Sequence, residues 1–163
     1  MPSKASQLNP FWSLSAIFVV AVGLNYVWEL AQAFLYVWTD DKKGIWWHCF
    51  VASLGDGLLL WVIFLIGWLV FRRSDWFVRP NRRQYAVMLT IGLTIGIAVE
   101  WVAVNLLGRW SYTEDMPLLG GSGIGVVPML QMLILPPVIF AIVAKLGAMR
   151  TAGTSYCSGP VKS

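Results

Sequence analysis

Apolar residues dominate four long runs of the chain, and short polar segments separate these runs. The runs cover 11–37, 45–71, 85–107 and 126–149, and each is longer than the roughly 20 residues that a helix needs to cross the hydrocarbon core. Asn9 and Pro10 precede the first run in the order typical of a helix N-cap and first helical position. The pattern predicts an all-α fold, a polytopic four-helix transmembrane bundle over 1–149, followed by a flexible tail over 150–163.

The composition supports this interpretation. Of the 163 residues, 58% are hydrophobic and only 12% are charged, whereas soluble domains carry about 25% charged residues. The net charge of +4 comes from basic residues beside the apolar runs, which is the pattern of membrane flanks rather than of nucleic-acid binding. Tryptophans near the ends of the runs indicate aromatic belts at the headgroup level. They are Trp12, Trp38, Trp46, Trp47, Trp68, Trp76 and Trp110.

The distribution of lysine and arginine predicts the orientation. Nine of the twelve lie on one side, namely Lys4, Arg72, Arg73, Arg79, Arg82, Arg83, Lys145, Arg150 and Lys162. The other three lie on the opposite side, namely Lys42, Lys43 and Arg109. Because positive charge stays inside, we expect both termini to be cytoplasmic and the protein to be integral to a membrane, the bacterial cytoplasmic (inner) membrane.

Three acidic residues, Glu29, Asp56 and Glu100, lie inside the apolar runs. Such a group costs roughly 2.5 to 3.5 kcal/mol to insert, so it usually faces a partner, a cavity or a ligand. Successive spans run in opposite directions, and the fixed helical rise therefore places these residues and Gln131 at a similar depth. The sequence predicts one polar layer to which all four helices contribute.

Helical spacing adds further residues to this layer. One face of the first span carries Asn25, Glu29, Gln32 and Tyr36. In the second span Ser53 shares a face with Asp56. In the third span Gly92 and Gly96 precede Glu100 at four-residue spacing, which favours close approach of another helix. Pro136 and Pro137 predict a kink in the fourth span. The candidate ligand-binding residues are Asn25, Gln32, Ser53, Arg109, Trp110, Tyr112 and Gln131.

The layer could serve two kinds of chemistry. Glu100, Glu29 and Asp56 are the catalytic candidates, because a carboxylic acid in a dry pocket can act as a general acid or share a proton. Alternatively, they only join the helices by hydrogen bonds. The sequence assigns no cofactor and predicts no metal site. His48 is the single histidine and only a weak candidate ligand.

The loop before the fourth span is rich in glycine and aromatic residues. It reads GRWSYT over 108–113 and LGGSGIGVVP over 119–128. We expect this loop to turn tightly and to fold back over the polar layer as a lid, because irregular backbone at membrane depth must be covered by protein or water.

The segment from Glu100 to Gln131 resembles the membrane lycopene cyclase domain of carotenoid synthesis. The resemblance consists of an acid late in one helix, a Gly-x-Trp-x-Tyr segment, a glycine-rich turn and a Val-Pro pair that opens the next helix. It implies a shared helical architecture and a hydrophobic pocket of isoprenoid size. In that family a paired-glutamate motif follows the proline, whereas this chain has Met129, Leu130 and Gln131 there.

Two functions follow as hypotheses. In the first, the polar layer binds a lipid-like or isoprenoid molecule and supports acid-base chemistry led by Glu100. In the second, the chain is a non-catalytic accessory subunit of a larger membrane protein complex. A pocket enclosed by the protein's own helices favours the first, and polar residues that face outward favour the second.

Overall fold

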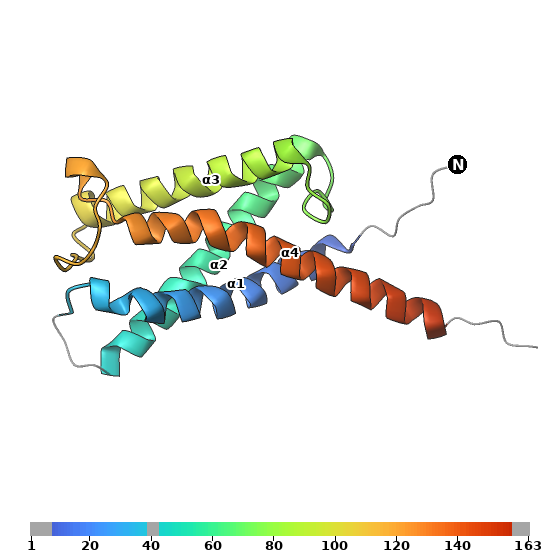
Figure 1. The fold of residues 1–163 in the computed structure, drawn as a ribbon. Coiled ribbons are helices and arrows are strands. Elements are labelled where there is room, and N and C mark those ends of the chain that lie inside the picture. Colours follow the sequence, from blue (N-terminus) through green and yellow to red (C-terminus); the bar gives the residue numbers. More distant parts are fainter. Residues whose placement is uncertain (1–7, 39–42, 158–163) are drawn as a thin grey trace, which may run out of the picture.

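The computed structural model describes residues 8–38 and 43–157, and this part of the chain is helical, without a β-strand (Figure 1). Its four long helices are α1 (Pro10–Gln32), α2 (Lys43–Phe71), α3 (Arg82–Trp101) and α4 (Val126–Cys157). Short 3-10 helices cover Ala33–Leu35 and Gly120–Ser122, and a π-helical turn covers Val102–Leu106.

The predicted four-span organisation is confirmed. Four segments are long and apolar enough to cross a membrane, Pro10–Leu35, Gly44–Phe71, Arg82–Leu106 and Val126–Ala152. Each boundary lies within three residues of the predicted one. Helix α4 continues through Cys157, so it includes the first part of the predicted tail, and residues 158–163 lie outside the described part. The side of the membrane on which the termini lie stays a prediction.

The helix starts follow the local sequence. The Asn9 side chain accepts a hydrogen bond of 2.9 Å from the backbone N–H of Phe11, as the predicted N-cap requires. Asn81 and Gln84 form a reciprocal capping box at the start of α3, with bonds of 2.7 and 3.0 Å between side chain and backbone. These caps provide partners for backbone N–H groups that have none within the helix.

The helices pack as a series of neighbours, in the order α2, α1, α4 and α3. Helix α4 lies between α3 and α1 and packs closely against both, and α1 also packs closely against α2 (Figure 1). In contrast, α2 and α3 meet near the loop that joins them and diverge toward their other ends. The α4 ribbon bends near its middle, in agreement with the kink predicted from the two internal prolines.

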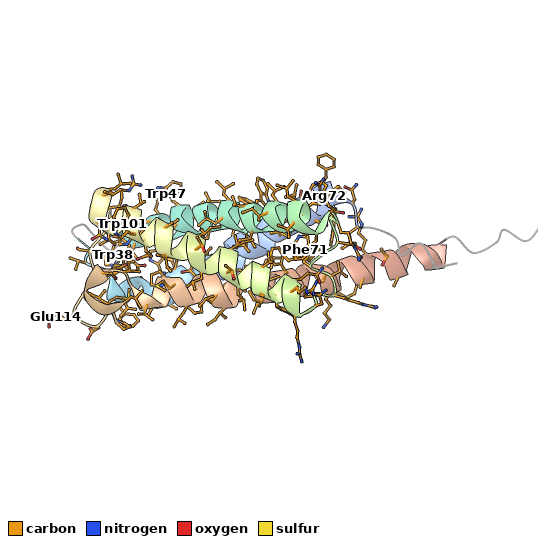
Figure 2. The ribbon with its side chains drawn as sticks, turned by 90° about the horizontal axis from the view of Figure 1, so that it is seen from above. Trp38, Trp47, Phe71, Arg72, Trp101 and Glu114 are labelled. Atoms are coloured by element: carbon orange, nitrogen blue, oxygen red, sulfur yellow. The ribbon has the colours of Figure 1, made fainter. Side chains whose placement is uncertain are left out.

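Aromatic residues mark both ends of the bundle. Trp38, Trp47 and Trp101 lie toward one end in Figure 2, while Phe71 and Arg72 lie at the other. Trp47 is 65% exposed, as expected for an interfacial belt. Trp76 was predicted to belong to such a belt, but it is only 1% exposed and packs against Phe140 of α4. Its burial closes the end of the bundle where α2 and α3 meet.

Candidate functional site

Gln131 of α4 is the centre of a buried hydrogen-bond network between three helices. Its side-chain Nε2 donates to Asn25 Oδ1 at 2.8 Å, to Asp56 Oδ2 at 2.9 Å and to Glu29 Oε1 at 3.2 Å. Gln131 is 2% exposed and Asn25 is fully buried. One primary amide has only two N–H groups, so these three acceptors share two protons. The network therefore has more acceptors than donors.

The end of α1 supports this network from the side. Gln32 Nε2 donates to Glu29 Oε1 at 3.0 Å and to Gln131 Oε1 at 3.2 Å. The indole of Trp28 donates to Gln32 Oε1 at 3.1 Å, which fixes the orientation of that amide. Asn25 Nδ2 bonds to the Ala21 carbonyl oxygen at 2.8 Å. The predicted polar face of α1 therefore points into the bundle.

A cavity of about 630 Å³ lies beside the network. Each long helix contributes a polar side chain to its lining, Glu29 from α1, Asp56 from α2, Glu100 from α3 and Gln131 from α4. The predicted common layer is thus confirmed, since these residues face one space. The volume is within the range of about 300 to 1,000 Å³ that is typical of small-molecule sites.

Glu100 is held by the loop rather than by Gln131. The phenol of Tyr112 donates a hydrogen bond to Glu100 Oε2, and the indole of Trp110 donates to the Tyr112 oxygen at 3.2 Å. Two backbone bonds join this part of the loop to the end of α1. Val37 N–H donates to the Ser111 carbonyl and Thr113 N–H to the Leu35 carbonyl, each at 2.9 Å. The loop therefore closes the end of the cavity.

The backbone around Glu100 and Tyr112 departs from regular structure. The π-helical turn begins two residues after Glu100, a distortion that often occurs at functional sites. Gly123 has a φ of +73°, a left-handed conformation that favours glycine. A Cβ atom at Gly125 would lie 2.9 Å from the Tyr112 hydroxyl, so a larger residue there would displace the tyrosine.

Two tyrosines outside the spans hold their phenol protons more tightly than usual. Burial, and next the hydrogen bond to Glu100, raise the pKa of Tyr112 above its ordinary value. Burial and the nearby Glu29 carboxylate raise the pKa of Tyr36. Both phenols therefore stay protonated at neutral pH, and Tyr112 remains a donor to Glu100.

Among the residues that the structure describes, no basic side chain forms an ion pair with the carboxyl groups of the site, although Arg109 lines the same cavity. The single ion pair among these residues joins Arg73 and Asp75, in the loop between α2 and α3. Within the same residues, no hydrogen bond reaches the second carboxyl oxygen of Glu29 or of Asp56. These oxygens are available to a ligand that offers hydrogen-bond donors.

The remaining predicted residues lie at different distances from the cavity. Arg109 and Trp110 line it, and so does His48, whose Nδ1 lies 2.7 Å from the Gly44 carbonyl oxygen. Ser53 is buried and donates to the Cys49 carbonyl at 2.6 Å, outside the lining. In the described ranges no three His, Cys, Asp or Glu residues are placed to hold a metal ion.

Sequence reasoning missed one aromatic side chain at the loop end of the cavity, that of Trp38, whereas Tyr36 belongs to the predicted polar face of the first span. Tyr36 and Trp38 line the cavity, and the Tyr36 ring lies 5.2 Å from that of Tyr112. Trp38 also packs edge-on against His48. Trp38 had been assigned only to the interfacial belt, and a position at the end of a span does not distinguish the two roles.

Tyr112→Phe is expected to loosen the loop over Glu100. A hydrogen bond to a charged group contributes about 1.5 to 3 kcal/mol, so we expect local opening to become roughly ten to one hundred times more frequent. Hydrogen exchange of the amides in 109–125 measures this change. Tyr26→Phe is the matched control, because Tyr26 packs only by its ring against Phe50. Equal exchange in the two variants would show that the phenol does not hold the loop.

No protein family matches the chain, and no curated protein or solved structure matches it either. The site must therefore be interpreted from its own geometry.

Proposed function

We propose that the cavity binds a lipid-like molecule of isoprenoid type that enters from the bilayer. The observation that carries this proposal is the composition of the lining, which combines the buried polar network with residues that face lipid. Val51 of α2 is 48% exposed and Val99 of α3 is 40% exposed, yet both line the cavity. The side opening between the diverging α2 and α3 therefore provides a path from the acyl chains to the carboxyl groups.

The polar network favours one class of ligand end group. Glu29 and Asp56 offer free acceptor oxygens, and the tyrosine and tryptophan rings at the loop end offer flat surfaces. An alcohol or amine satisfies such acceptors, because each offers hydrogen-bond donors. We propose a hydroxylated isoprenoid as the ligand, with Glu29, Asp56 and Glu100 as the groups that exchange protons with it.

The alternative, an accessory subunit of a membrane complex, receives less support. Its polar residues should face outward to meet a partner, but Asn25, Gln32 and Gln131 are all buried within the bundle. Polar groups that bond to each other around an internal cavity need no second protein to satisfy them. We propose that the protein acts in the bacterial cytoplasmic membrane with both termini in the cytoplasm.

Gly55→Phe is expected to block the proposed entry. Gly55 of α2 is exposed, lines the cavity, and has no atom within 4 Å of an added Cβ. The first side-chain atom therefore has open space, and a phenyl ring carried on it is expected to occupy the opening. Gly23→Phe on α1 is the matched control, since Gly23 is also exposed with no atom within 4 Å but lies outside the cavity.

The probe is geranylgeraniol, added to the full chain in mild detergent. A ligand at one hundred times its Kd stabilises the native state by about 2.7 kcal/mol. We expect that shift in thermal stability for the natural sequence and for Gly23→Phe, and its loss in Gly55→Phe. Analysis of co-purified lipids should show the same difference. Two results would each refute binding through this opening. Geranylgeraniol would stabilise none of the three proteins, or it would stabilise Gly55→Phe and Gly23→Phe equally.

A further inference from the structure

A second cleft, of about 360 Å³, lies where the loop between α2 and α3 packs against α3 and α4. Its walls share no residue with the cavity around Gln131. The apolar floor is formed by Phe77, Met88 and Phe140, each only 1% exposed. Arg79 and Lys145 are exposed residues of its lining. The cleft thus combines a buried apolar floor with two cationic side chains.

The charges of the cleft are all of one sign. None of its lining residues is acidic. Among the described residues Arg79 and Lys145 form no ion pair, because the one pair present joins Arg73 to Asp75. Asp75 accepts two bonds of 3.0 Å from that guanidinium, which holds the pKa of its carboxyl group below the ordinary value. Its charge is thus already compensated by Arg73.

The cleft also extends from the loop between two helices onto a helix that is apolar enough to cross a membrane. Arg79 lies in the loop before the span that begins at Arg82, while Pro137 and Ala141 of the lining lie well inside the span that ends at Ala152. An amphiphile matches this arrangement, because its anionic end can contact the two cations while its hydrocarbon chain lies along α4. Free phosphate would leave the apolar floor without a partner.

We propose that this cleft binds an anionic phospholipid, with its phosphate between Arg79 and Lys145 and the upper part of an acyl chain on the floor beside Phe140. Basic pockets between transmembrane helices are known to recognise such headgroups. The lipid would fill the groove between α3 and α4 and fix the loop over 72–81. This proposal does not depend on the ligand of the first cavity.

The test compares two double variants of the full chain in detergent. The cleft variant is Arg79→Gln with Lys145→Gln, and the control is Arg82→Gln with Arg83→Gln, two exposed arginines outside the cleft. Retention of phosphatidylglycerol is measured by native mass spectrometry. Each basic residue near the membrane surface contributes about 1 kcal/mol, so binding should weaken roughly tenfold to thirtyfold in the cleft variant. The control variant should bind phosphatidylglycerol as tightly as the natural sequence does.

A third variant separates the cleft from general surface charge. Ala141→Phe keeps every charge but fills the groove, because Ala141 is an exposed residue of the lining. We expect it to lose phosphatidylglycerol as well. Three results would each overturn the proposal: equal weakening in the arginine control, equal retention of phosphatidylcholine, or equally tight binding of inorganic phosphate. Stabilisation by geranylgeraniol should be unchanged in all of these variants, which separates this test from that of the first cavity.

Discussion

Gln131→Leu is expected to destabilise the folded protein by about 3 kcal/mol, because it removes the donor shared by three helices. Leucine has a similar volume, so packing is nearly unchanged. The loss instead comes mainly from Asn25 and Asp56, whose acceptors would remain inside the bundle without this donor, while Glu29 keeps its bond from Gln32. A buried acceptor left unpaired costs about 1 to 3 kcal/mol, and more when it is charged.

Unfolding of the detergent-solubilised chain measures this effect. Leu130→Ala is the control, because Leu130 lies in the same turn but is 42% exposed. Hydrogen bonds between membrane helices average only about 0.6 kcal/mol when one pair is removed. A loss near that value for Gln131→Leu would mean that the acceptors find other donors, and Gln131 would not be the centre of the network.

The depth of the polar layer could be predicted from sequence because it depends on two fixed quantities, the rise per residue and the alternation of span direction. These suffice to place Glu29, Asp56 and Gln131 together. The central role of Gln131 follows from chemistry that the sequence also contains. Among the four polar residues of the layer it alone carries N–H donors, while carboxylates only accept.

The partner of Glu100 could not be predicted in the same way. It depends on Tyr112, which reaches the carboxylate only because the loop turns at Gly123 and bonds to the end of α1 at Leu35. Such contacts join residues far apart in the chain, and helical periodicity contains no information about them. The π-helical turn after Glu100 likewise interrupts the helical periodicity from which the shared helix faces were predicted.

Trp76 shows the same limit at the other end of the bundle. Its place near the end of a span predicted an interfacial position, but its indole donates to the Phe64 carbonyl at 3.2 Å and lies against Gly67 of α2. Only a glycine at 67 leaves room for the ring. A short loop that folds back on its own helix can bury an aromatic residue that hydropathy alone would assign to the membrane surface.

The second large effect on stability is expected at the contact between α3 and α4. Gly92→Val is expected to destabilise the protein by about 3 kcal/mol, the upper end of the usual range for overpacking. The first atom that a Cβ at Gly92 would meet is the main-chain carbonyl oxygen of Met132. A side chain in that place could rotate away, but a backbone carbonyl cannot, so the two helices must separate. Thermal unfolding in detergent measures the change.

Variants at two other glycines serve as controls for this prediction. A Cβ at Gly96 would lie 3.2 Å from the Met132 side chain, so Gly96→Ala should be tolerated with a small adjustment. Gly23→Val, with no atom within 4 Å, should leave stability nearly unchanged. Since Met132 follows Gln131 directly, separation of α3 and α4 at Gly92 also displaces the hydrogen-bond network. Gly92→Val and Gln131→Leu should therefore cost less together than the sum of their separate effects. Strict additivity would show that the small-residue contact and the polar layer are independent.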